Sequence, residues 1–148
     1  MKREKHIWLW IATIMQYLTA AFHSTGFFIE ATPANDTEAQ LIKLMKTHKM
    51  DLGAGFHPTM DNLFISMSIS FTLLCIFGGI LNNYLLKKKP EIGLLKGLVV
   101  IQTIIFGLLF VTMLAFTFII PIIFTGLIFL ALLIELVSFR RQASLVSR

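Results

Sequence analysis

Four long runs of apolar residues dominate the pattern of this chain of 148 residues. They cover roughly residues 7–28, 63–86, 94–115 and 118–139. Each has about 20 residues or slightly more, enough for a helix rising 1.5 Å per residue to cross a hydrocarbon core of ~30 Å. The bilayer core offers no water to the backbone, so such segments have to be helical. The pattern predicts an all-α fold, an integral membrane four-helix bundle in a single domain over residues 1–148.

The third and fourth runs form one nearly continuous apolar stretch that is too long for a single crossing. Residues 116–120 are aromatic or β-branched, and Pro121 follows them. Proline is tolerated in the first turn of a helix but disrupts its interior. We therefore expect a tight turn within residues 116–120, with Pro121 in the first turn of the last helix.

The segment of residues 30–60 between the first two runs is the only sizeable polar part. Asn35 followed by Glu38 resembles a capping box at a helix N-terminus. The next residues alternate with helical spacing between an apolar set and flanking lysines: Leu41, Leu44, Met45 and His48 against Lys43, Lys46 and Lys49. We predict a short amphipathic helix that either lies on the outer membrane face or caps the bundle.

Basic residues gather at the ends of the apolar runs rather than in a groove. Those on one side of a four-span chain are Lys2, Arg3, Lys5, Lys87, Lys88, Lys89, Lys96, Arg140, Arg141 and Arg148. The positive-inside rule then places both termini in the cytoplasm. This distribution argues against nucleic-acid binding, which needs a basic groove. A cleaved signal peptide, with a small-residue site around residues 19–21, is the competing interpretation of the N-terminal run.

Composition narrows the class of protein further. Hydrophobic residues make up 56% of the chain and charged residues 14%. A soluble domain of this size could not bury so much apolar surface, which argues against a soluble enzyme. Cys75 is the single cysteine, so an intrachain disulfide, a dithiol redox site and a cysteine-rich metal site are all excluded.

Polar residues form a stripe on each of the first two runs. The stripe on the first run contains Thr13, Gln16, Ala20, His23, Phe27 and Glu30. The stripe on the second run contains Asp61, Ser68, Thr72, Cys75, Gly79 and Asn82. Polar residues inside a membrane avoid lipid, so these two helices should pack through their stripes.

Two histidines and two carboxylates fall at the outer ends of these helices: His23, His57, Glu30 and Asp61. If they converge, they could bind a transition metal, ligate haem through two histidines, or relay protons. The alternative is that His23 forms a hydrogen bond between helices and His57 is a loop residue. The cofactor itself stays open.

Glu135 is the acidic residue within the fourth run, near its cytoplasmic end. A carboxylate inside a membrane is a candidate functional group. Lys96 should lie at a similar depth, so an ion pair between Lys96 and Glu135 is the structural alternative.

The segments Phe22-His-Ser-Thr-Gly26 and Met60-Asp-Asn-Leu-Phe-Ile-Ser-Met-Ser resemble a family of small bacterial inner-membrane proteins. The resemblance covers about the first 85 residues. It implies four helices and a bacterial inner-membrane location, and it implies no activity. Members often carry a second histidine after the His-x-x-Gly motif, where this chain has Phe27, so a two-histidine site within the first helix is not implied.

Three functional hypotheses follow. The first is a non-enzymatic membrane protein that binds a hydrophobic ligand, a second copy of itself or a larger membrane complex. The second is a metal- or haem-binding redox protein that uses His23 and His57. The third is a small transporter that works through Glu135, Gln16 and His23.

Overall fold

In a computed structural model, the backbone is described for residues 6–30 and 32–146 and the side chains up to residue 139. This part of the chain forms five helices: α1 (Ile7–Thr25), α2 (Asp36–Thr47), α3 (Met60–Lys88), α4 (Ile92–Phe116) and α5 (Ile119–Val146). Outside the helices, the described residues form no strand and one isolated antiparallel β-bridge, between Lys49 and Thr59. The all-α class is therefore confirmed.

The expected four-helix membrane bundle is wrong. The described residues hold five helices, and three of them are long and apolar enough to cross a membrane: Met60–Lys88, Ile92–Phe116 and Ile119–Phe139. α1 is not among these three, because Gln16, Tyr17 and His23 interrupt its apolar run and the helix ends at Thr25. The orientation with both termini in the cytoplasm assumed four spans, so it no longer follows.

That orientation also depended on charges that lie outside the described residues. The structure does not describe residues 1–5 or the side chains of residues 140–148. Lys2, Arg3, Lys5, Arg148 and the side chains of Arg140 and Arg141 therefore lie outside the described part of the chain.

The chain divides into two compact units, which we describe separately. The first unit joins residues up to 19 with those from residue 75 onward, and the second unit is residues 20–74. Both α1 and α3 run from one unit into the other. The single domain over residues 1–148 stays a prediction.

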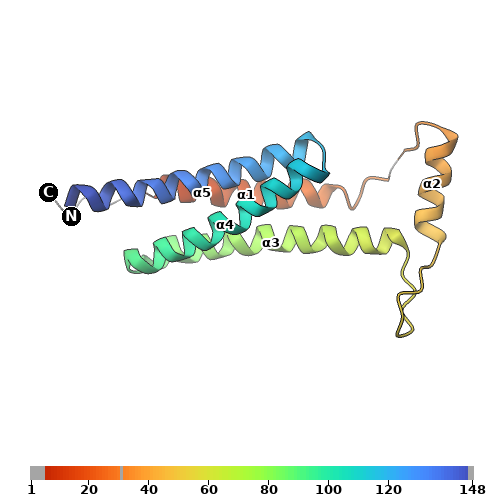
Figure 1. Cartoon of the computed structure of the whole chain (residues 1–148), viewed down its shortest axis with the longest axis horizontal. Coiled ribbons are helices and arrows are strands. Elements are labelled where there is room, and N and C mark those ends of the chain that lie inside the picture. The colour runs from red at the N-terminus through yellow and green to blue at the C-terminus, as the bar shows by residue number, and fades with distance from the viewer. Residues whose placement is uncertain (1–5, 31, 147–148) are drawn as a thin grey trace. The chain divides into compact units, whose positions relative to one another are not determined.

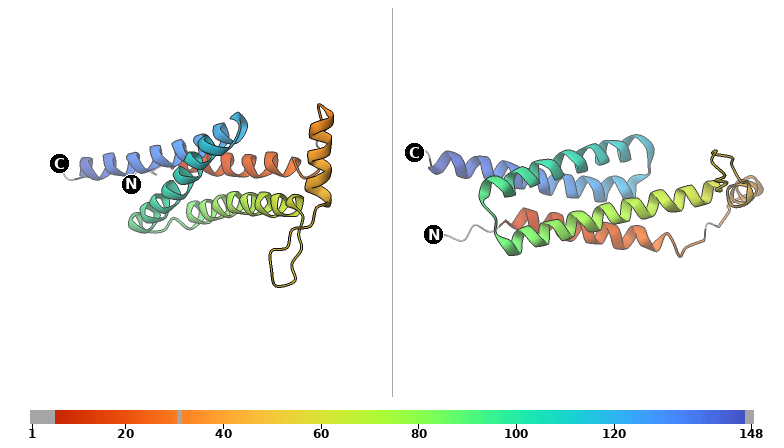
Figure 2. Two further views of the ribbon diagram at one scale, coloured as in Figure 1. Left: turned by 45° about the vertical axis from the view of Figure 1, so that its right-hand side comes forward. Right: turned by 90° about the horizontal axis from the view of Figure 1, so that it is seen from below.

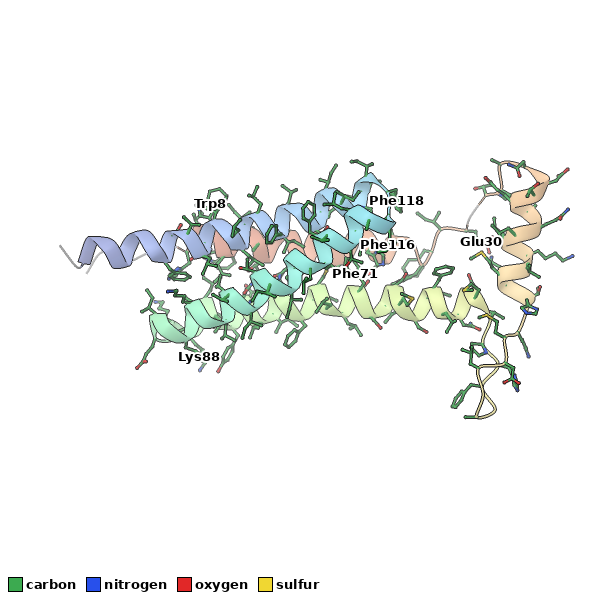
Figure 3. The ribbon with its side chains drawn as sticks, viewed as in Figure 1. Trp8, Glu30, Phe71, Lys88, Phe116 and Phe118 are labelled. Atoms are coloured by element: carbon green, nitrogen blue, oxygen red, sulfur yellow. The ribbon has the colours of Figure 1, made fainter. Side chains whose placement is uncertain are left out.

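The helices α4 and α5 form a hairpin in the first unit (Figures 1 and 2). The turn is the extended residue Thr117 with Phe118, and Pro121 lies in the first turn of α5. This confirms the turn expected within residues 116–120. Phe116 and Phe118 flank the turn (Figure 3), and their side chains are 83% and 66% exposed.

Aromatic side chains fit against glycines where the two hairpin helices meet. Phe129 of α5 lies against Gly107 of α4, and Phe110 of α4 lies against Gly126 of α5. The two rings stack on each other, with centroids 6.1 Å apart and planes 18° from parallel. Each glycine makes room for the ring from the opposite helix, which lets the two backbones approach closely.

The second unit contains α2, which begins where the capping pattern predicted. The Asn35 side chain accepts a hydrogen bond from the Glu38 backbone N–H at 2.9 Å. The Glu38 carboxylate accepts in return from the backbone N–H of Ala34 at 2.7 Å, one residue before the position expected in a capping box. The capped helix of 12 residues confirms the short helix predicted between the first two apolar runs.

Candidate functional site

Three carboxamide side chains form a closed ring of hydrogen bonds in the first unit. Asn82 of α3 donates to Gln16 of α1 at 3.0 Å, and Gln16 donates to Gln102 of α4 at 3.3 Å. Gln102 then donates to Asn82 at 2.7 Å, which completes the ring. Gln16 and Asn82 are fully buried, and Gln102 is 5% exposed. Each amide therefore both donates and accepts within the ring, which offsets the cost of burying it.

A glycine of α3 makes the room for this ring. A Cβ atom on Gly78 would overlap the side-chain amide of Gln16. The next glycine, Gly79, lies against the ring of Tyr17, whose hydroxyl accepts a hydrogen bond from Asn83 at 2.9 Å. The middle of α1 thus meets the second half of α3 through two adjacent glycines and two polar pairs.

The expectation that these helices pack through their polar stripes is confirmed for Gln16 and Asn82. Gln102 was missed. It is the one carboxamide in the apolar run of residues 94–115, and that isolation is the signal that could have identified it. The sequence does not show which neighbouring helix such a residue faces.

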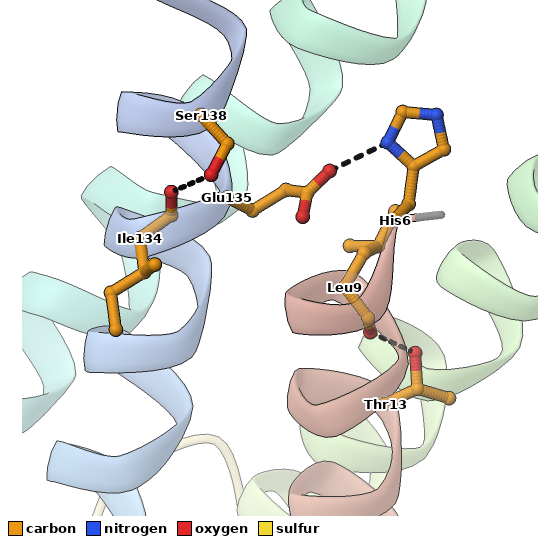
Figure 4. A network of polar contacts seen from close by, with 6 residues as sticks. All are labelled: His6, Leu9, Thr13, Ile134, Glu135 and Ser138. Carbon is orange, nitrogen blue, oxygen red and sulfur yellow. Dashed lines mark hydrogen bonds and ion pairs between the residues drawn. The ribbon is translucent and has the colours of Figure 1, made fainter. Parts of the chain in front are cut away.

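Glu135 of α5 pairs with His6, at the start of α1, and not with Lys96. Oε1 of Glu135 lies 2.7 Å from Nδ1 of His6, and Glu135 is only 3% exposed (Figure 4). The imidazole also lies against Phe139, with ring centroids 5.6 Å apart. The side chain of Lys96 is exposed. The expected ion pair between Lys96 and Glu135 is therefore wrong, because similar depth on adjacent helices does not make two side chains face each other.

The four candidate ligands at the outer helix ends all belong to the second unit, where each has different surroundings. His23 lies edge-on to Phe71 at 4.8 Å and to Phe27 at 6.2 Å. The carboxylate of Glu30 lies 3.9 Å from Lys46, and that of Asp51 lies 3.9 Å from His57. The fourth candidate, Asp61, is in the first turn of α3. The described residues contain no group of three or more His, Cys, Asp or Glu side chains that could hold a metal ion.

His23 still has a property that a ligand needs. Its Nε2 atom is buried without a hydrogen-bond partner, as is the hydroxyl of Thr72. Desolvation by burial lowers the pKa of the His23 imidazole, which favours the neutral form that binds metals. The redox hypothesis stays a prediction. It is tested by an absorption spectrum and metal analysis of the purified protein beside His23→Ala.

No protein-family model, no curated protein and no solved structure matches this chain. The resemblance to small bacterial inner-membrane proteins therefore stays a prediction as well.

Taken by itself, the polar interior of the first unit favours holding helices together over reacting with a substrate. The carboxamides of Gln16, Asn82 and Gln102 are neutral and already paired. They neither exchange protons near neutral pH nor act as nucleophiles. The titratable pair there consists of Glu135, which is buried, and His6, which is partly buried.

Proposed function

We propose that this chain is a non-enzymatic integral membrane protein that acts by binding other membrane components. The observation that carries this proposal is the closed amide ring of Gln16, Asn82 and Gln102. Its polar groups bind one another across three helices, so they hold the helices in place and are not available for a substrate.

The apolar helices supply the surface for such binding. Within its most apolar stretch, α3 is 22% buried, α4 is 22% buried and α5 is 28% buried. The remaining apolar surface must contact lipid, a second copy of the chain or a larger membrane complex, because exposure of so much apolar surface to water is unfavourable. The resemblance to small bacterial inner-membrane proteins supports that membrane as the location.

Photo-crosslinking in the native membrane tests this proposal. A photoreactive residue would replace exposed Leu108 of α4, which is 66% exposed, and in a control variant buried Phe106 of the same helix, which is 2% exposed. We expect a discrete crosslinked protein or lipid product from position 108 and only intramolecular products from position 106. A protein that migrates as a monomer, copurifies with no partner or lipid and gives no product from position 108 would contradict the proposal.

The transporter hypothesis is the second candidate, and the contact of buried Glu135 with partly buried His6 favours it. Charged groups within apolar helices often mark proton or ion pathways. Proton flux into proteoliposomes would test this hypothesis. If the hypothesis is right, Glu135→Gln abolishes the proton flux. Lys96→Gln, which changes an exposed side chain, leaves the flux intact. Equal flux in wild type and Glu135→Gln would exclude a transporter that uses this carboxylate.

A further inference from the structure

The helix α2 is amphipathic, and two leucines of its apolar face are left exposed by the described residues. No residue of α2 is buried, although the structure describes all of Asp36–Thr47. Leu41 is 55% exposed and Leu44 is 58% exposed. A helix that capped the other helices of its unit would bury such leucines, so that alternative does not fit.

The two lysines of α2 lie on its other side. A helix turns about 100° per residue, which places Lys43 opposite Leu41 and Lys46 opposite Leu44. Lysine side chains are long enough to reach water while the helix lies against an apolar layer. This division is typical of helices that lie in a membrane interface.

The direction of α2 agrees with such a position. Within the unit of residues 20–74, α2 runs across the direction of α3 (Figures 1 and 2). Since α3 is long and apolar enough to cross a membrane, a helix that runs across α3 lies along the membrane plane. Short segments, residues 26–35 and 48–59, connect α2 to α1 and α3 and keep it close to the end of a membrane-crossing helix.

The occupant of the apolar face follows from its size and its charge. With 12 residues, α2 is ~18 Å long and ~10 Å wide, so one face offers roughly 200 Å². That is well below the ~800 Å² that each partner buries in a stable protein interface. Binding to a bilayer has no such minimum of buried area.

The net charge around α2 gives this helix no preference for anionic lipid. Residues 30–61 carry three lysines and five carboxylates: Lys43, Lys46 and Lys49 against Glu30, Asp36, Glu38, Asp51 and Asp61. A net negative segment gains little from an anionic surface, so burial of the apolar side chains has to provide the binding free energy. We therefore infer that α2 lies in the headgroup layer of the chain's own membrane, with Leu41 and Leu44 turned towards the acyl chains.

Site-specific fluorescence tests this inference on the full chain. Cys75 is buried and is the single cysteine, so a Cys75→Ala variant provides a background for one new cysteine at a time. An environment-sensitive fluorophore would be attached at Leu41→Cys or Leu44→Cys, and in matched controls at Lys43→Cys or Lys46→Cys. Because α2 buries no side chain, these changes leave the packing of the other helices intact.

The labelled protein would be measured in phosphatidylcholine nanodiscs that contain a lipid with a nitroxide near the headgroup. We expect the leucine positions to show a blue shift of emission, quenching by the nitroxide lipid and loss of quenching by aqueous iodide. The lysine positions should show the reverse. Equal iodide quenching on both sides would place α2 in water, and protection of the leucine side from both quenchers would mean that protein covers it. Either result would overturn the inference.

Discussion

Three carboxamides from three helices satisfy one another inside the first unit, and none of them can be replaced without affecting the other two. Removal of one amide leaves a donor on one neighbour and an acceptor on the other without a partner in an apolar interior. A ring of this kind therefore specifies which helices are adjacent and in what register. The apolar contacts around it provide most of the packing free energy but much less directional selectivity.

We predict that Gln16→Met lowers the free energy of unfolding by about 1–2 kcal/mol, because it leaves Nδ2 of Asn82 and Oε1 of Gln102 unpaired. Tyr17→Phe, the control, removes only the partly buried acceptor of Asn83 and should cost less. Reversible unfolding in mixed micelles measures both. In the Gln16→Met background, Asn82→Leu should cost less than in wild type, since the ring is already broken. Additive losses would contradict a coupled ring.

The pair of Glu135 and His6 gives a second prediction at this scale. A double-mutant cycle of Glu135→Gln with His6→Ala should show a coupling free energy of about 1–3 kcal/mol, because a buried carboxylate loses its hydrogen-bond partner. The cycle of Glu135→Gln with Lys96→Ala should be additive, since Lys96 is exposed. The same unfolding assay measures both cycles. Coupling to Lys96 and none to His6 would reverse this assignment.

Between elements, the glycines and phenylalanines of the α4–α5 hairpin determine how close the two helices come. A Cβ atom on Gly107 would lie 2.9 Å from the ring of Phe129, whereas nothing lies within 4 Å of a Cβ atom on Gly97, on the same helix. We predict that Gly107→Ala destabilises the protein by about 1–3 kcal/mol through overpacking. Gly97→Ala should be neutral or stabilise by up to ~1 kcal/mol through helix propensity.

Unfolding free energies of the two glycine variants check this prediction, and a rescue variant makes it specific. Phe129→Leu should recover part of the loss in Gly107→Ala, because it removes the atoms that the new methyl group meets. If both alanine variants behaved alike, close approach at Gly107 would not be what holds the hairpin together.

The positions of the elements were predictable to different degrees. The break at Thr117–Phe118 and the cap at Asn35 depend on local chemistry, and both were predicted from the residues around them. The end of α5 was not predicted. Hydropathy identifies only the apolar part of a helix, and α5 continues beyond that part to Val146. α1 likewise ends at Thr25 and not near residue 28, where the apolar run ends.

Contacts between elements were harder to predict than the elements themselves. Gln16 and Asn82 were identified because each lies on a polar stripe of its own helix. The partnership of Glu135 with His6, 129 residues apart, depends on which helices are neighbours, and that information is not contained in either helix alone. A count of four bundled helices failed for a related reason, because hydropathic runs identify apolar segments and not how they assemble.

For the whole molecule, three candidate membrane-crossing helices would determine which loops share a face. If α3, α4 and α5 each cross, then the residues before α3 and the α4–α5 turn lie on one face, and the residues between α3 and α4 lie on the other. Asp51 lies before α3, Thr117 lies in the α4–α5 turn and Lys88 is the last residue of α3. All three are exposed, so each can report its face when it is replaced by a labelled cysteine.

We predict that Asp51→Cys and Thr117→Cys react with a membrane-impermeant maleimide from the same side of sealed vesicles, and that Lys88→Cys reacts only from the opposite side. Each variant would carry Cys75→Ala, and permeabilised vesicles would show the full extent of labelling. The prediction depends on the turn at Thr117 reaching water. We expect that it does, because the last carbonyls of α4 and the first N–H groups of α5 lack helical partners, and unpaired backbone groups are costly in hydrocarbon. Labelling of position 117 from the Lys88 side would mean that α4 does not cross. Protection of position 117 from both sides would mean that the exposed rings of Phe116 and Phe118 hold the turn below the surface.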